Sequence, residues 1–387
     1  MNYFQKILGA SKEEVKRIAS SWYMFGFLTW IPLLGFGLII AIFFEGVPRD
    51  LPIGVVDQDN SQLSRMQLSR IESSATLQIK KNYSSVHDAS IGLRDGTIYA
   101  FVVIPENFER SLRQGKQPDI TIMLNTQFIL MSKILHAALT SVLLNSAASI
   151  SFVSHLVDDE RPELAKSAVA PIRMQITPFF NTYNNYFLFL ISAMLPALWS
   201  IFIVLTMIIA LGEMFKRKAE GAWLESAGGS VSAALLGKMF PYIVVQMLWG
   251  LGIVYFVYGV MPWPFAGSWT ILAFGMFLTI VIYQIIALLF YGMKFEYASA
   301  LSFGAVFTAP AFAAMGITFP LMNMEGVAVA WHDMLPISHY IHIQISQANY
   351  GGSLESVGTT FLALALFFLM TPLVYWRYKS TSTRWSV

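Results

Sequence analysis

The sequence has no cysteine and few charged residues. Among its 387 residues there is no Cys, and only 12% are Asp, Glu, Lys or Arg. Without cysteine the chain has no disulfide bonds, no thiolate metal site and no cysteine nucleophile. A soluble protein has about 25% charged residues, so half of the usual solvating charge is missing. The net charge of +2 also argues against a surface that binds nucleic acid.

Apolar residues take the place of the missing charge. Hydrophobic residues make up 56% of the chain and aromatic residues 14%. A helix needs ~20 mostly apolar residues to cross a bilayer. Six stretches of this kind predict an α-helical polytopic membrane protein with six transmembrane helices. We expect them at 22–44, 186–211, two within 239–293, 298–320 and 356–376.

The first and third apolar regions need separate interpretation. Residues 22–44 exceed the 7–15 apolar residues of a signal-peptide core, and no small-residue cleavage site follows them, so we expect a retained signal anchor. The region 239–293 is long enough for two helices. It is broken at 261–267, where two prolines and a glycine cannot continue a helix.

The distribution of basic residues predicts the orientation. The short segments 261–267 and 321–355 contain no Lys or Arg, whereas the segments that alternate with them are basic. Because Lys and Arg stay on the cytoplasmic side, we expect both termini inside. The predicted cytoplasmic parts are an N-terminal segment, 1–21, a loop, 212–238, and a tail, 377–387. Their basic residues, with one from the short turn near 294–297, are Lys6, Lys12, Lys16, Arg17, Lys216, Arg217, Lys218, Lys238, Lys294, Arg377, Lys379 and Arg384.

Residues 45–185 have the composition of a soluble domain inserted between the first two spans. Short β-type runs alternate in them with segments of helical periodicity, which predicts an extracytoplasmic α/β domain. The expected strands are 53–56, 76–79, 99–104 and 120–124. The expected helices begin near Ser61, Val86 and Pro105, and a long one spans 127–157. Pro162, Pro171 and Pro178 indicate an irregular return to the membrane.

The chain lacks the phosphate loop of an ATPase. That loop needs glycines followed by Gly-Lys-Ser or Gly-Lys-Thr. The only Gly-Lys pairs, at Gly115 and Gly237, are not followed by Ser or Thr. We therefore expect no catalytic site and no cofactor in this chain.

Two clusters contain residue types that bind metal ions. Asp57 and Asp59 occupy the first positions of a calcium loop, but Gln62 and Leu68 replace its glycine and glutamate. A turn and a helix cap are the better interpretation. The second cluster is His332, Asp333, His339 and His342. It lacks a His-Glu-x-x-His pattern, and hydrogen-bonded or solvated histidines are the commoner case, so we assign no metal.

A mixed-charge run follows the second span. It is either a basic anchor with an interfacial tryptophan or a short helix along the membrane that offers both charge signs to a cytoplasmic partner. Asn181, Asn184 and Asn185 precede that span as candidate helix caps or substrate contacts. The residues of the run are Glu213, Lys216, Arg217, Lys218, Glu220, Trp223 and Glu225.

The whole arrangement resembles permease subunits of type 2 ABC exporters, specifically the bacterial subgroup with a large extracytoplasmic domain between the first two spans. Three passages carry the resemblance. Residues 53–61 are similar to the family's first strand and Asp-x-Asp-x-Ser turn, and 218–221 resemble its charged coupling segment. Residues 321–341, with Leu-Pro-Ile-Ser-His at 335–339, resemble the outer hairpin before the last span.

This resemblance implies export of an amphipathic or hydrophobic substrate across the bacterial cytoplasmic membrane. ATP and magnesium would bind to a separate ATPase subunit, which would contact the seven residues of the mixed-charge run. A second copy or a related permease would complete a dimer, and a periplasmic adaptor is a further expected partner besides membrane lipid. Two alternatives remain at this stage: a membrane-anchored receptor or assembly scaffold, and an intramembrane metalloenzyme built on the histidine cluster.

Overall fold

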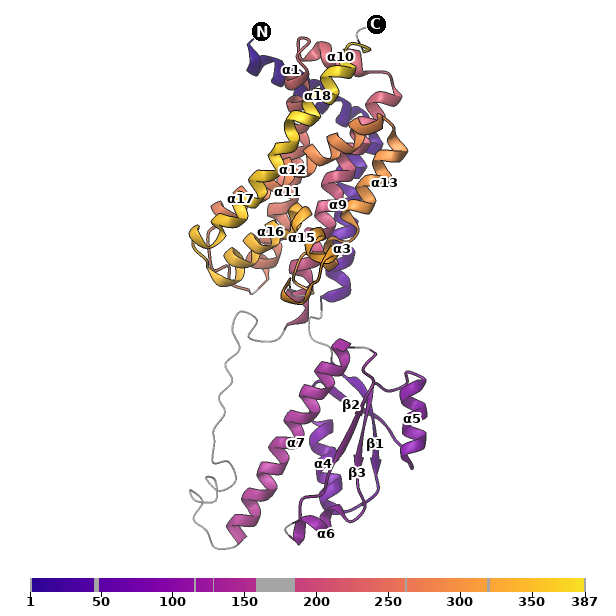
Figure 1. The fold of residues 1–387 in the computed structure, drawn as a ribbon. Coiled ribbons are helices and arrows are strands. Elements are labelled where there is room, and N and C mark those ends of the chain that lie inside the picture. Colours follow the sequence, from indigo (N-terminus) through magenta and orange to yellow (C-terminus); the bar gives the residue numbers. More distant parts are fainter. Residues whose placement is uncertain are drawn as a thin grey trace. The chain divides into compact units, whose positions relative to one another are not determined.

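The computed structural model describes residues 2–44, 49–114, 116–127, 129–157, 185–261, 263–318 and 321–385. The chain divides into two compact units, which are described separately (Figure 1). One comprises 1–46 with 178–387, and the other comprises 47–177. The three prolines of the expected return segment, together with Asn181 and Asn184, lie outside the described residues.

The smaller unit is the predicted α/β fold. Its sheet has the strand order β2-β1-β3-β4, in which β1 runs parallel to β2 and β3, and β4 is antiparallel to β3. The strands are β1 Leu51–Asp57, β2 Leu77–Asn82, β3 Ala100–Ile104 and β4 Thr121–Leu124. The helices are α4 Gln62–Glu72, α5 Val86–Arg94, α6 Phe108–Arg113 and α7 Ile129–Val157.

Both faces of this sheet are covered. Helices α4 and α7 lie on one face and α5 lies on the other (Figure 1). Successive residues of a strand point to opposite faces. Accordingly, Val102 packs with Ile71 and Leu139 on the first face, while its neighbour Phe101 packs with Ala89 on the second. A parallel strand buried on both sides reads as a continuous apolar run, which explains why the sequence revealed these strands.

The larger unit contains the predicted membrane helices. Among the described residues, six helical segments are long and apolar enough to cross a bilayer. They are Trp22–Phe43, Phe187–Lys216, Val231–Val260, Trp269–Lys294, Tyr297–Ala314 and Glu355–Ser382. The component helices are α2 Trp22–Leu28, α3 Trp30–Phe43, α9 Tyr186–Lys216, α11 Val231–Tyr255, α12 Trp269–Lys294, α13 Tyr297–Thr308, α14 Ala311–Ala314, α17 Gly358–Leu366 and α18 Thr371–Ser382.

Helices α9 and α12 form the centre of this unit. Their most apolar windows are 67% buried, against 22–28% for the other four spans. Trp199 of α9 and Tyr283 of α12 are fully enclosed. A helix that is apolar all round belongs in the middle of a bundle, and the remaining spans turn apolar side chains outward, as hydrocarbon requires.

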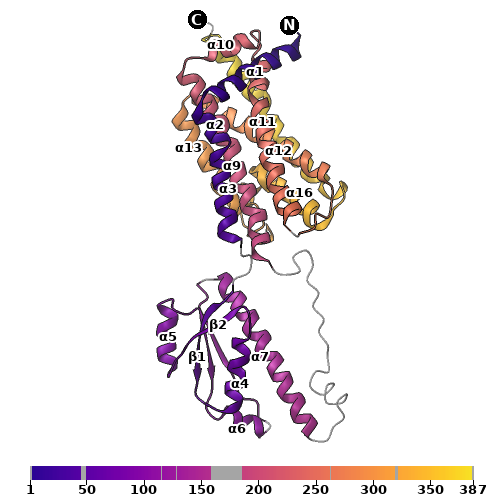
Figure 2. The ribbon, with the colours of Figure 1, turned by 180° about the vertical axis from the view of Figure 1, so that it is seen from behind.

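Shorter helices lie at the two ends of the bundle. The end that carries both termini has α1 Tyr3–Ser20 and α10 Glu220–Ser226 (Figure 2). The opposite end has α15 Val327–Met334 and α16 Pro336–Ile345. Helix α1 lies directly on α11, because Gly237 has no side chain: a Cβ there would be 2.5 Å from Cβ of Ala10 and 2.7 Å from the carbonyl oxygen of Ile7.

Candidate functional site

The link between α9 and α11 is shorter than the predicted loop 212–238. Helix α9 continues to Lys216 and α11 already begins at Val231. Both helices continue beyond their apolar stretches into polar residues. A prediction from hydropathy therefore ended α9 too early and began α11 too late. Lys218, between α9 and α10, takes a left-handed conformation with φ of 52°.

Trp223 anchors α10 inside the chain. We expected this ring to be buried in a partner, but it is only 2% exposed in the chain itself. Its Nε1 donates a hydrogen bond to the carbonyl oxygen of Ala234 at 3.2 Å, and its ring lies 5.9 Å from that of Trp385. Gly221 lets the C-terminal segment approach, since a Cβ there would be 2.7 Å from the carbonyl oxygen of Trp385. Trp223 therefore fixes α10 rather than facing outward.

The charged residues of the run separate into two groups. Glu213 and Arg217 form an ion pair. Together with Lys216 they line a cavity of about 910 Å³ beside α9. Lys218 and Glu225 are exposed around α10, and Glu220, its first residue, is partly buried. Three of the seven residues thus line the cavity, and three others lie on or beside α10.

A buried ion pair connects α1 to α11. Lys238 was counted above as a loop residue, but it lies within α11 and is completely buried. Its Nζ donates to Oε1 of Glu14 at 2.9 Å, and the Tyr242 hydroxyl donates to the same oxygen at 2.7 Å. Nη1 of Arg17 lies 3.6 Å from Oε2 of Glu14. The sequence does not predict this ion pair, because no local pattern connects residue 14 with residue 238.

The surroundings of Glu14 stabilise its carboxylate form. Burial alone would raise the pKa of Glu14 above the usual value of 4.5. The charges of Lys238 and Arg17 and the hydrogen bonds from Lys238 and Tyr242 lower the pKa by more than burial raises it. The net effect is a lowered pKa. Glu14 is therefore ionised at neutral pH despite its burial.

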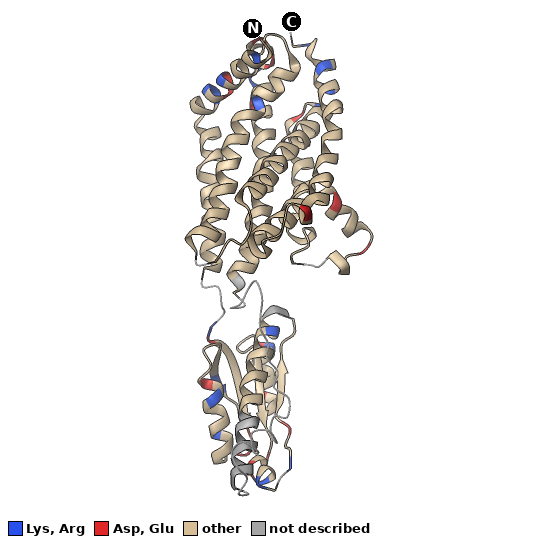
Figure 3. Ribbon diagram, turned by 90° about the vertical axis from the view of Figure 1, so that its left-hand side faces the viewer, with Lys and Arg blue, Asp and Glu red and all other residues tan. Residues whose placement is uncertain are grey.

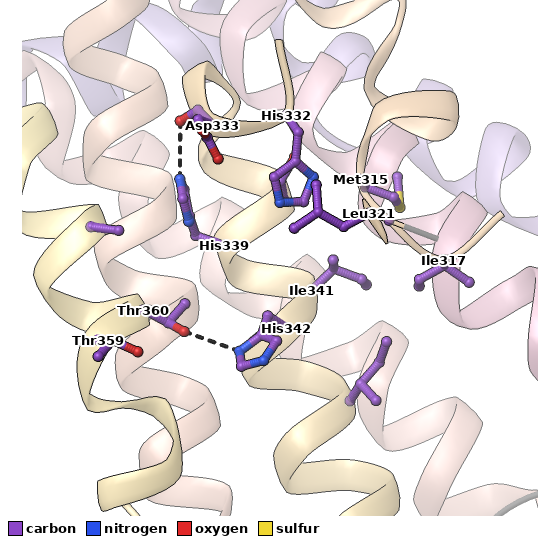
Figure 4. A pocket seen from close by; sticks show the side chains of 14 residues that line it. Met315, Ile317, Leu321, His332, Asp333, His339, Ile341, His342, Thr359 and Thr360 are labelled. Carbon is purple, nitrogen blue, oxygen red and sulfur yellow. Dashed lines mark hydrogen bonds between the residues drawn. The ribbon is translucent and has the colours of Figure 1, made fainter. Parts of the chain in front are cut away.

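The predicted histidine cluster lines a pocket of about 400 Å³ near α15, α16 and α17 (Figure 4). Each ring has a hydrogen-bond partner. Nδ1 of His332 lies 2.7 Å from the carbonyl oxygen of Ala314, and Nε2 of His339 lies 3.0 Å from that of Asp333. Nδ1 of His342 lies 3.0 Å from the Thr360 hydroxyl. The hydrogen-bonded interpretation of these histidines is confirmed.

The carbonyl contacts determine the tautomers of two of these rings. A carbonyl oxygen only accepts, so Nδ1 of His332 and Nε2 of His339 carry the protons. Burial lowers the pKa of His339, against the raising effect of the Asp333 carbonyl. Among the described residues, no three His, Asp or Glu side chains converge on one metal position.

The Asp57–Ser61 passage is a turn and a helix cap, as predicted. Oδ1 of Asp57 accepts hydrogen bonds from the backbone N–H groups of Asp59 and Asn60. The Ser61 hydroxyl accepts from the N–H of Ser64 and caps α4. Asn185 likewise caps α9 by accepting from the N–H of Leu188, which confirms its interpretation as a cap.

The comparison with known families agrees with this architecture. The family described as "ABC-2 family transporter protein" matches residues 22–375, which is most of the chain. The protein belongs to the ABC-2 transporter family. It is a transmembrane permease component of an ABC transporter, and a separate subunit supplies the ATPase. No curated protein matches the chain by sequence.

Proposed function

We propose that this ABC-2 permease exports an amphipathic or hydrophobic substrate across a bacterial cytoplasmic membrane. In this proposal both termini are cytoplasmic, 47–177 lies outside, and two permeases form a dimer with two ATPase subunits. A periplasmic adaptor would receive the substrate. The observation that carries the proposal is α10, a short helix between two spans at the end with both termini. Its Trp223 packs into the chain, and its Glu225 is exposed.

The charge distribution supports this orientation. Lys and Arg residues gather at the end of the helical unit that carries the N- and C-termini (Figure 3). The segments at the opposite end, 261–267 and 321–355, have none. Short loops rich in Lys and Arg stay in the cytoplasm, and an ATPase that uses cytoplasmic ATP must dock on that side.

The local structure of α10 suits it to transmit force. Trp223 donates a hydrogen bond to Ala234 of α11. Its ring also packs on Trp385, which follows α18 in the sequence. A push on α10 would therefore reach two membrane helices at once. The exposed Lys218 and Glu225 offer both charge signs to a docking groove. Exposed ion pairs are worth only ~0–1 kcal/mol each, so docking depends on several contacts together.

Reversal of the two exposed charges on and beside α10 tests the docking surface. The variant Lys218→Glu/Glu225→Lys leaves Trp223 and the partly buried Glu220 in place, so α10 should stay folded. We expect it to lose the ATPase subunit on affinity purification while it inserts into the membrane at the wild-type level. A matched control reverses two acidic residues of the opposite end, Glu325→Lys and Glu355→Lys.

The control should retain the ATPase. If the α10 variant retains as much ATPase as the wild type, the docking site lies elsewhere. If both variants lose it, the effect is a general loss of folding rather than docking, and the assignment to α10 fails.

A further inference from the structure

A large cavity opens at the end of the helical unit that carries the termini. Helix α9 packs there against both α2 and α13 (Figure 2). The volume of the cavity is about 910 Å³, and its walls come from the start of α2, the last turns of α9 and the junction of α12 with α13. Gly212 makes part of the wall possible. A Cβ at this position would lie 2.3 Å from Cδ2 of Tyr297, so the tyrosine ring packs directly on the backbone of α9.

Aromatic rings dominate the apolar part of this cavity. Trp22 is 86% exposed, Tyr23 45% and Tyr297 40%. Deeper in the wall, Phe215 stacks on Tyr291 with 5.2 Å between ring centroids. Exposed rings at the ends of spans suit the membrane interface, and these rings also border the cavity and give it an aromatic wall. The faces of aromatic rings are negative in electrostatic potential, so they attract organic cations.

The wall also contains two carboxylates, Glu213 and Glu296, beside two basic groups, Lys216 and Arg217. The Glu213 side chain is only 17% exposed, and its Oε1 accepts from Ser21 and pairs with Arg217. Its Oε2 is buried, and within the described part of the chain it has no hydrogen-bond partner. Glu296, exposed at the start of α13, adds a second carboxylate. The negative charge of Glu213 is thus held in the wall.

The positive groups are held less firmly. The Arg217 side chain is 58% exposed and Lys216 is exposed. Long basic side chains can extend their charged heads into water while their stems cover apolar surface. The heads of Lys216 and Arg217 can therefore reach water beside the cavity, whereas one oxygen of the Glu213 carboxylate is enclosed in the wall.

We propose that this cavity binds a hydrophobic organic cation between the aromatic rings, Glu213 and Glu296. That the bound molecule is the transported substrate rests on the proposed function above. The assignment changes the role of Glu213, Lys216 and Arg217, which we first interpreted as ATPase contacts. They are wall residues of the cavity, and their neighbours on α10 form the docking surface.

Binding of tetraphenylphosphonium to the full chain in phosphatidylcholine nanodiscs tests this proposal. Empty discs give the background from lipid partitioning, and tetraphenylborate serves as a probe of the same shape with opposite charge. We expect saturable binding of the phosphonium and none of the borate. Glu213→Gln/Glu296→Gln should weaken the phosphonium about tenfold or more. The matched variant Lys216→Gln should bind it as well as the wild type or better.

Glu296→Gln alone covers the case in which the Glu213 variant fails to fold, because Glu296 is exposed and accepts a hydrogen bond from the neighbouring Ser299 hydroxyl. Equal binding of phosphonium and borate would overturn the proposal, as would wild-type affinity in both Glu→Gln variants. The assay needs no ATPase, so failure here with an intact ATPase complex rejects the cavity assignment and leaves the permease function standing.

Discussion

Replacing Lys238 by methionine should weaken the packing of α1 on α11. The change removes the ammonium group that pairs with Glu14, whose side chain is only 1% exposed. Removal of one partner from a buried ion pair costs roughly 3–5 kcal/mol, because the other charge stays buried. Glu14 would keep the Tyr242 hydrogen bond at 2.7 Å and the Arg17 charge at 3.6 Å. We therefore expect the lower end of this range, about 3 kcal/mol.

The thermal midpoint of the purified chain in detergent measures this effect. For a unit of this size 1 kcal/mol corresponds to roughly 2–4 °C, so the midpoint should fall by about 6–12 °C. The double variant Glu14→Gln/Lys238→Met removes both charges and should lose at least ~2 kcal/mol less than the sum of the two single changes. Lys12→Met, an exposed position on the same helix, should stay within ~0.5 kcal/mol of the wild type. Additive single effects, or a Lys238→Met midpoint equal to that of Lys12→Met, would refute the reasoning.

Three other outcomes follow from the same end of the molecule. Trp223→Ala should destabilise α10 by ~3–5 kcal/mol and lower ATPase co-purification, while Trp223→Phe, which loses the bond to Ala234 but keeps a smaller aromatic ring, should retain more of it. Gly237→Ala should cost ~1–3 kcal/mol by overpacking against Ala10, measurable as faster proteolysis within α1. Because the pKa of Glu14 lies below its usual 4.5, its contribution is complete above that pH and is lost as the pH falls through the lowered pKa. Melts of the wild type and Glu14→Gln should therefore converge in acid; a constant gap would contradict this.

The secondary structure was predictable because its signals are local. Apolar stretches located the six spans, and the 3.6-residue and continuous apolar patterns located α4, α5 and β3. Ser61 and Asn185 could be recognised as caps from residue type and position. The sheet class followed from the alternation of strands and helices, although the antiparallel direction of β4 required the structure.

The candidate site was only partly predictable because its contacts are distant in sequence. Trp223 has the composition of an interfacial anchor, and only its bond to Ala234 and contact with Trp385 show that it packs inward. Lys238 resembles an inner-loop cation until Glu14 is placed beside it. The cavity at Gly212 likewise depends on segments that are distant along the chain, since Trp22 and Tyr297 are about 275 residues apart.

Site-specific crosslinking tests the central claim, that the ATPase docks on α10, most directly. The chain has no cysteine, so a single Glu225→Cys on the exposed face of α10 can carry a photoactivatable crosslinker in membranes that contain the ATPase subunit. Met322→Cys, 90% exposed near the opposite end of the bundle, is the matched control. The account predicts a permease–ATPase adduct from Glu225→Cys and none from Met322→Cys. An adduct from Met322→Cys, or none from Glu225→Cys in an intact complex, would contradict it.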